Sequence, residues 1–301
     1  MSIDPWWKAE ARVSEVLKTL GITKLPVDPF AIADARDIAY QENQSLDSGI
    51  SGCLMKVGDE FGIIYSTRFA SNGFKRFTVG HELGHYFLDG HVQHLFGAGQ
   101  TLHHSVSGFL SGDVYESEAD AFAASLLMPK NLFKDACENA GQGIEAVKVL
   151  ADICGTSLTT TSIRYARLNT SPVAVICSVG QKVAFAFMSN ALKARRNLTW
   201  IKKGAGLPPQ SVTAAFNRNI ANVHDAKCET GQSSLADWFH GDDLEVNEDV
   251  IGLGEYGRTL TVLWADSLPD PDDSVTRSDG REDEESESLL PSQRFYKKTR
   301  Y

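Results

Sequence analysis

Cysteine is scarce in this 301-residue chain, and no two cysteines form a C-x-x-C pair. The five cysteines are scattered and odd in number, so the sequence predicts neither a disulfide framework nor a zinc site made of cysteines. No apolar run is long enough for a signal peptide or a membrane span, and we therefore expect a cytoplasmic protein. The net charge of −10 argues against a protein that binds nucleic acid over its whole surface.

The most informative segment that is present is the pentapeptide His81-Glu82-Leu83-Gly84-His85. Residues four apart lie on one face of a helix, so His81 and His85 can offer two imidazole nitrogens to one metal ion. Glu82 can reach a water molecule bound to that metal. This is the H-E-x-x-H pattern of zinc peptidases, which supplies two ligands and a general base. The alternative is a helix that carries two histidines by chance.

A second segment, from Glu116 to Pro129, predicts a helix that can complete the site. Its apolar residues recur at helical spacing, and Pro129 ends the run. A catalytic zinc ion needs three protein ligands and one open position, and Glu116 is our candidate for the third ligand. Asp120 can accept the second ring N–H of a ligating histidine. The alternative is that these acids only complement the helix dipole, which is the interpretation that we favour for Glu118.

His91 is an alternative third ligand, because it follows His81 at the spacing of the metzincin pattern H-E-x-x-H-x-x-G-x-x-H. That pattern places glycine at the eighth position, where the chain leaves the helix, but this chain has Leu88 there. The expected break comes later, at Asp89-Gly90, which is typical of a helix C-terminus. We therefore expect His91 to lie just beyond the helix end.

These motifs resemble those of the ImmA/IrrE metallopeptidases. The resemblance rests on the segments Arg76–His85 and Glu116–Pro129 and on the opening segment around Gly21–Asp28, and it extends over residues 1–170 or so. It implies a zinc enzyme with His81, His85 and Glu116 as ligands and Glu82 as the catalytic base. Members of the family typically cleave a helix-turn-helix repressor and so derepress a stress, phage or mobile-element programme. This chain departs from them between the two motifs, where its segment is longer and rich in His, Gly and Ser.

Residues 91–112 connect the two predicted site helices, and we expect them to form a long loop, which in other proteins is often a functional lid. The loop also carries His94, His103 and His104. Zinc peptidases need a hydrogen-bond donor besides the metal to stabilise the oxyanion, and His104 and Tyr115 are our candidates for that donor. The alternative is a solvated loop whose histidines take no part in the reaction.

The rest of the first 130 residues predicts an α+β domain. Helices are expected from Asp4 to Gly21 and after Asp28, and strands over 38–41, 52–56 and 61–66. The strand over 61–66 is our candidate for an edge that pairs with an extended substrate, and an internal strand is the alternative. Arg76 is expected either to anchor the active-site helix or to contact the substrate.

Residues 143–169 resemble a helix-turn-helix with its turn at Gly155-Thr156-Ser157. One interpretation is DNA contact through Arg164 and Arg167. Because two arginines make a small basic footprint, we favour the other interpretation, a structural module that packs on the peptidase.

From Ser171 the pattern changes to β. Strands are expected over 173–177, 183–188, 200–201, 244–246 and 259–264, which together predict a small α+β domain. By resemblance to family members with a C-terminal sensor, we expect this domain to be GAF-like. A basic cluster in it is a candidate site for a small phosphate-bearing ligand or single-stranded DNA, and consists of Lys193, Arg195, Arg196, Lys202 and Lys203. The alternative is a solvated loop face.

The sequence therefore predicts an α+β protein in four parts. These are a zincin-like peptidase domain with a small mixed sheet (1–130), a helix-turn-helix-like helical module (131–170), an α+β sensor domain (171–267) and a disordered acidic tail with a basic and aromatic end (268–301). We expect a zinc-dependent endopeptidase that cleaves a helix-turn-helix repressor. The alternatives are a DNA-binding regulator with a vestigial metal site, and a peptidase whose loop or tail blocks the metal until a signal binds.

Overall fold

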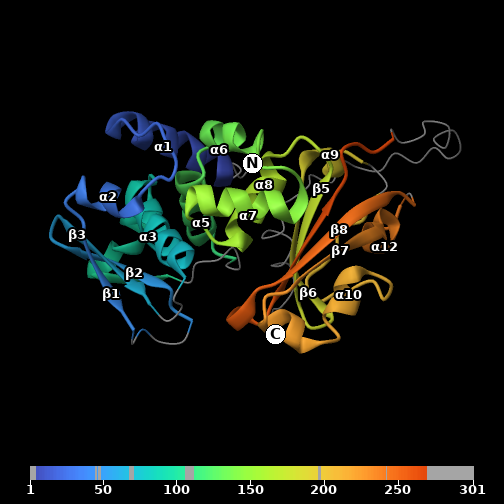
Figure 1. Ribbon diagram of the computed structural model, residues 1–301. Coiled ribbons are helices and arrows are strands. Elements are labelled where there is room, and N and C mark those ends of the chain that lie inside the picture. Colours follow the sequence, from blue (N-terminus) through green and yellow to red (C-terminus); the bar gives the residue numbers. More distant parts are fainter. Residues whose placement is uncertain are drawn as a thin grey trace, which may run out of the picture. The chain divides into compact units, whose positions relative to one another are not determined.

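The computed structural model describes residues 5–44, 46, 49–67, 71–105, 112–195, 198–241 and 243–269 (Figure 1). These residues form two compact units. The first unit contains the residues up to Asp135 together with Ala151–Ser157, and the second contains Ala136–Leu150 and the residues from Leu158 onward. The boundaries expected at residues 130, 170 and 267 remain predictions. Most of the expected tail, residues 270–301, lies outside the described residues.

The helices of the first unit begin where the sequence has proline or a capping residue. They are α1 (Pro5–Leu20), α2 (Pro29–Asp34), α3 (Asn72–Phe87), α4 (His91–Leu95), α5 (Val114–Leu127) and the start of α6 (Lys130–Cys137). Asp28 caps α2 as predicted, and Asp113 caps α5 by accepting the backbone N–H groups of Tyr115 and Glu116. The predicted cap of α1, Asp4, lies outside the described residues. No helix in the described part of the chain is long and apolar enough to cross a membrane.

A small mixed sheet completes the first unit, as predicted. Its strands are β1 (Ala39–Asn43), β2 (Gly52–Val57), β3 (Glu60–Ser66) and β4 (Leu102–Ser105), in the spatial order β1-β3-β2-β4. β1 runs parallel to β3, and the other neighbouring pairs are antiparallel. The edge role predicted for residues 61–66 is wrong, because β3 lies between β1 and β2. The apolar pattern of one strand does not say which strands pair with it.

The connection between the two site helices is not one unstructured loop, so this prediction is corrected. It contains α4, a short 3-10 helix (Gly97–Gly99) and β4. β4 has too few residues and too polar a sequence to be recognised as a strand, and it forms because it pairs with β2, with Ser105 opposite Gly52. Residues 106–111 lie outside the described residues.

The second unit is built on an antiparallel sheet. Its strands are β5 (Val173–Val179), β6 (Lys182–Met188), β7 (Cys228–Ser234), β8 (Glu245–Gly252) and β9 (Thr259–Trp264), in the order β6-β5-β9-β8-β7. The sequence pattern missed β7, whose residues are polar and largely exposed. The strand predicted at Trp200-Ile201 is wrong, since these residues are irregular and pack half-buried against the apolar core of the unit.

The helices of the remaining chain are short, apart from the predicted helix-turn-helix segment. They are α7 (Gly143–Cys154), α8 (Leu158–Leu168), α9 (Asn190–Lys193), α10 (Val212–Phe216), α11 (Ile220–His224), α12 (Leu235–Phe239) and a 3-10 helix at Gly254–Tyr256. α7 and α8 flank the predicted turn at 155–157. Arg164 on α8 is 0% exposed, and Arg167 is half-buried. DNA contact through Arg164 is therefore not compatible with this fold.

Candidate metal centre and active site

The two site helices, α3 and α5, pack against each other through small residues (Figure 1). A Cβ atom added to Gly84 would lie 3.0 Å from the Cα atom of Ala119, and one added to Gly80 would lie 3.4 Å from the Cα atom of Ala123. Larger residues at these positions would force the helices apart. The close approach allows side chains from both helices to meet at one point.

His81, His85 and Glu116, the predicted ligands, meet there in a buried group that could hold a metal ion. The Nε2 atoms of the two histidines are 3.1 Å apart. The carboxylate oxygens of Glu116 lie 3.3 Å from His81 Nε2 and 3.2 Å from His85 Nε2. Ligand atoms held about 2.0 Å from a tetrahedral zinc ion are separated by about 3.3 Å. The two imidazole nitrogens have this spacing, and each lies at a similar distance from a different oxygen of Glu116. The three side chains can therefore reach one zinc ion.

Two buried oxygens around this group support the fit. Glu116 Oε2 and Glu82 Oε1 accept no hydrogen bond from any residue that the structure describes. Buried polar atoms normally have a partner, because an unpaired one costs free energy. A divalent cation and a water molecule are partners suited to two carboxylate oxygens, and both would complete the group.

Glu82, the predicted general base, is fully buried beside the ligands. Ser105 on β4 donates a hydrogen bond from Oγ to Glu82 Oε2 at 3.1 Å, a contact that no sequence motif predicts. Gly52 on β2 makes room for the carboxylate, since a Cβ atom there would lie 2.7 Å from Glu82 Oε1. Burial raises the pKa of Glu82 to about 7, although the nearby His81 and the Ser105 hydrogen bond act in the opposite direction. A pKa near neutrality suits a general base.

Asp120 lies where the sequence reasoning placed it. Its Oδ1 atom is 2.8 Å from His81 Nδ1, and both side chains are buried. Burial lowers the pKa of His81, but the hydrogen bond to Asp120 and the Glu116 carboxylate 3.3 Å from Nε2 outweigh burial and raise that pKa to about 10. With Nδ1 held by Asp120, the Nε2 atom is directed at the ligand group.

His85 has a different partner, His91, which the structure leaves outside the ligand group. The Nδ1 atoms of these two histidines are 3.1 Å apart, and His91 Nε2 lies 2.9 Å from Glu118 Oε2. Lys8 on α1 donates to the same Glu118 oxygen at 2.5 Å. The sequence predicted that His91 lies just beyond the helix end, which is confirmed, but not its contact with His85. Glu118 was interpreted only as an acid of the first helical turn, so its contact with His91 was missed.

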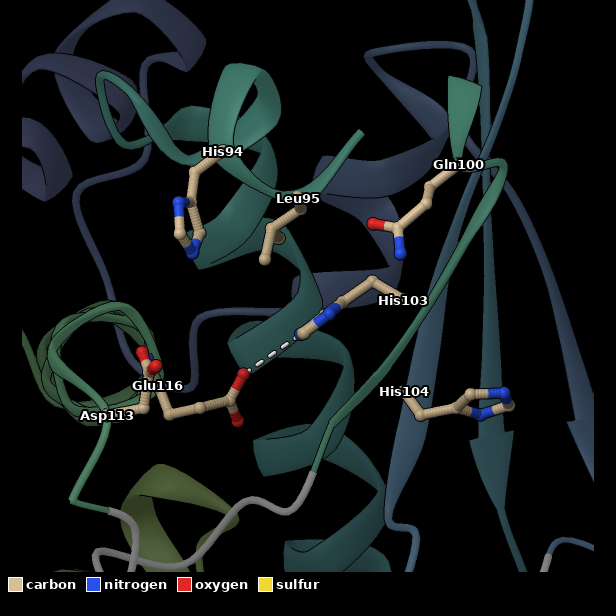
Figure 2. Close-up of a pocket in the computed structure, with 7 residues that line it drawn as sticks. All are labelled: His94, Leu95, Gln100, His103, His104, Asp113 and Glu116. Atoms are coloured by element: carbon tan, nitrogen blue, oxygen red, sulfur yellow. Dashed lines mark hydrogen bonds and ion pairs between the residues drawn. The ribbon is translucent and has the colours of Figure 1, made fainter. Parts of the chain in front are cut away.

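A cavity of about 330 Å³ opens beside Glu116 (Figure 2). It is lined by His94, Leu95, Gln100, His103, His104, Asp113 and Glu116. Figure 2 shows His103 pointing toward Glu116, and its Nε2 atom lies 2.9 Å from Glu116 Oε1. The cavity thus reaches the ligand group at Glu116, with the His103 imidazole beside that carboxylate.

The two donors named from the sequence, His104 and Tyr115, have other contacts. His104 also lines the cavity, but its ring points away from Glu116 (Figure 2). Its Nδ1 atom lies 3.0 Å from Cys53 Sγ. Tyr115 stacks on His94, with ring centroids 3.9 Å apart. Among these residues, His103 is the one that the structure places against a ligand.

Arg76 anchors the start of α3. Its side chain is buried and donates hydrogen bonds from Nη2 to the carbonyl oxygens of Val27 at 2.6 Å and Cys154 at 3.4 Å. Of the two roles considered for this arginine, the contacts favour the anchor.

The basic cluster of the second unit is only partly described. Lys193, Lys202 and Lys203 are exposed, and Arg195 donates to the carbonyl oxygen of Pro269 at 2.8 Å. Arg196 lies outside the described residues. A signal-binding role for this cluster remains a prediction.

Comparisons with known proteins identify a family for part of the chain. The sequence of residues 57–163 matches the family described as IrrE N-terminal-like domain. Among solved structures, a Mycobacterium tuberculosis transcriptional regulator is similar with a TM-score of 0.55 and 15% sequence identity, over 87% of this chain and 77% of that chain. At this identity the likeness concerns the fold alone. No curated protein matches the sequence.

Proposed function

Because residues 57–163 are an IrrE N-terminal-like domain, of the ImmA/IrrE metallopeptidases, we propose that this protein is a zinc-dependent endopeptidase. The observation that carries the proposal is the buried group of His81, His85 and Glu116 beside a cavity. Zinc bound there would polarise the scissile carbonyl of a peptide and acidify the attacking water. The site belongs to a zincin-like domain, in which α3 supplies two ligands and the base.

Glu82 acts as the general base in this proposal. It accepts a proton from the attacking water and then delivers it to the leaving amine. Ser105 holds Oε2 by its hydrogen bond at 3.1 Å, so Oε1 is the oxygen left for the proton. The pKa of about 7 allows Glu82 to release the proton again within the same cycle.

His103 is the proposed donor to the oxyanion, in place of His104 and Tyr115. Negative charge develops on the carbonyl oxygen during attack, and a hydrogen-bond donor in a partly buried site stabilises it. The side chain of His103 is 21% exposed, lines the cavity and contacts Glu116. A substrate that enters the cavity would therefore meet this imidazole next to the ligands.

The proposed substrate is a helix-turn-helix repressor encoded next to this protein, so that its cleavage derepresses a stress, phage-defence or mobile-element programme. The family match of residues 57–163 supports this choice.

The test is a cleavage assay on the neighbouring repressor with added zinc. We expect the native protein to cut it, and Glu82→Gln to retain zinc but lose cleavage, because an amide cannot accept the proton. The matched control is Glu60→Gln, an identical chemical change at an exposed residue of β3 that leaves the base and the ligands intact. Cleavage by Glu82→Gln at the native rate would contradict the assigned role, and no cleavage by the native protein would contradict this substrate.

We further propose that the second unit is a GAF-like sensor that regulates cleavage. Its five-strand antiparallel sheet and the exposed Lys193, Lys202 and Lys203 support a site for single-stranded DNA or a small phosphate-bearing ligand. The test compares cleavage rates with and without single-stranded DNA for the native protein and for the double variant Lys202→Glu, Lys203→Glu. A rate that DNA does not change would contradict the sensor role.

A further inference from the structure

We propose that His91 and Glu118 are positioning residues that fix the orientation and the proton of His85 as a metal ligand. The proposal rests on the zinc site proposed above. It assigns a role to two buried residues that neither bind the metal nor contact the substrate in the mechanism given. His91 is 0% exposed and Glu118 is 9% exposed.

The distances determine where each proton must be. His85 points its Nε2 atom at the other ligands, 3.1 Å from His81 Nε2 and 3.2 Å from Glu116 Oε1. An imidazole that binds a metal through Nε2 carries its proton on Nδ1. His85 Nδ1–H therefore donates to the atom 3.1 Å away, His91 Nδ1, which must be unprotonated to accept.

The proton of His91 is then on its other nitrogen. His91 Nε2–H donates to Glu118 Oε2 at 2.9 Å, and the carboxylate can only accept. Lys8 donates to the same oxygen and supplies the compensating positive charge. The chain of donors thus runs in one direction, from His85 through His91 to Glu118.

Without the Glu118 carboxylate, this direction is no longer fixed. A neutral imidazole can carry its proton on either nitrogen. If His91 carried its proton on Nδ1, the N–H groups of His91 Nδ1 and His85 Nδ1 would point at each other. Two donors facing each other at 3.1 Å would turn His85 away from the metal. His81 avoids this problem because its partner, Asp120, is itself a carboxylate.

The local fold shows how His91 reaches this place. Gly90 adopts a left-handed conformation with φ of 85°, which turns the chain directly after α3. α4 begins at His91, and Arg12 on α1 pairs with Asp89 just before the turn. His91 has the sequence spacing of the third metzincin ligand, but it contacts the Nδ1 atom of His85 and lies outside the ligand group.

The test measures the zinc dissociation constant by competition with a chromophoric chelator. We expect His91→Ala and Glu118→Ala to bind zinc about 10-fold to 100-fold more weakly than the native protein. Glu118→Gln recovers most of the affinity, because its amide oxygen still accepts the His91 proton. The matched control is Asp89→Ala, in the same segment as His91. It breaks an exposed ion pair with Arg12 of α1 and should leave the zinc dissociation constant within about twofold of the native value.

Three results would contradict the proposed positioning of His85 by His91 and Glu118. The first is zinc binding by Glu118→Ala at native strength, and the second is Glu118→Gln as weak as Glu118→Ala. The third is complete loss of zinc in His91→Ala, as in His85→Ala, which would make His91 a ligand. Circular dichroism melting of each variant shows that the fold persists, and Glu118→Gln retains the size of the native side chain. Because the readout is zinc affinity, a protein that cleaves no repressor can still pass this test.

Discussion

Without metal, His81 is held by two carboxylates, one from Asp120 and one from Glu116. Burial lowers the pKa of His81, but these carboxylates raise it to about 10, so the imidazole is protonated at neutral pH. Zinc can bind to Nε2 only after that proton leaves. Metal binding and proton release are therefore coupled at a single residue.

This coupling predicts that zinc binds more tightly as pH rises. Below a pKa of about 10 the proton competes with zinc, so each unit of pH between 6 and 8 should strengthen binding about tenfold for one released proton. Calorimetric titrations in two buffers with different ionisation enthalpies count the protons released. An affinity that is independent of pH would show that His81 is already neutral in the metal-free protein.

His103 and His104 offer a second comparison of single residues. We expect His103→Ala to lower kcat about 100-fold with zinc content unchanged, because an oxyanion donor is lost. His104→Ala removes the neighbouring imidazole, which faces Cys53, and should change kcat far less. Steady-state cleavage kinetics and zinc analysis of both variants provide the measurement. Equal losses in the two variants would contradict the assignment.

The sequence predicted some of these residues and missed others for a physical reason. His81, His85 and Glu82 are recognisable because helical periodicity alone brings them together. His91, Glu118 and Ser105 act through contacts between different elements, and no regular spacing reports such contacts.

Among the elements, α3 and α5 determine the geometry of the site. Their separation is set by Gly80 and Gly84 facing Ala119 and Ala123. Two ligands come from α3 and one from α5, so a change in helix separation changes the distance between donors.

Gly84→Ala should therefore weaken zinc binding and destabilise the protein. The new methyl group would lie 3.0 Å from the Cα atom of Ala119, and overpacking of this kind costs about 1 to 3 kcal/mol. The higher helix propensity of alanine stabilises the helix by about 1 kcal/mol or less, which offsets only part of this cost. Urea unfolding and zinc titration give both quantities. The control is Gly97→Ala, because Gly97 is exposed and a Cβ atom there meets no described atom within 4 Å. Equal changes in stability and zinc affinity in the two variants would contradict this account.

The longer elements were predictable and the short ones were not. Apolar periodicity identifies α1 and α5, whereas α4 and β4 have too few residues to show a period. The strand over 61–66 exists as predicted, but its place inside the sheet follows from its pairing with β1.

At the scale of the whole molecule, the first unit is not continuous in sequence. It includes Ala151–Ser157, which follow Leu150 of the second unit. Arg76 joins distant segments of this unit by donating to carbonyl oxygens of Val27 and Cys154. A prediction from local sequence pattern cannot detect that residues 151–157 belong to the first unit, because it compares only neighbouring residues.

Arg76→Ala should therefore lower the free energy of unfolding by about 1 to 3 kcal/mol, because two carbonyl groups lose a buried donor. The control is the neighbouring Lys75→Ala. Lys75 is partly exposed and makes one long ion pair, 3.9 Å from Glu42, so its loss should change the free energy of unfolding by less than about 0.5 kcal/mol. Denaturant unfolding compares the two. A similar small effect for both would mean that Arg76 does not anchor the unit.

The zinc content of the purified protein tests the central claim most directly. Inductively coupled plasma mass spectrometry should find one zinc ion per chain in the native protein and in Glu82→Gln, and little or none in Glu116→Ala. Native protein without zinc, or Glu116→Ala with as much zinc as the native protein, would contradict the assignment of His81, His85 and Glu116 as a metal site.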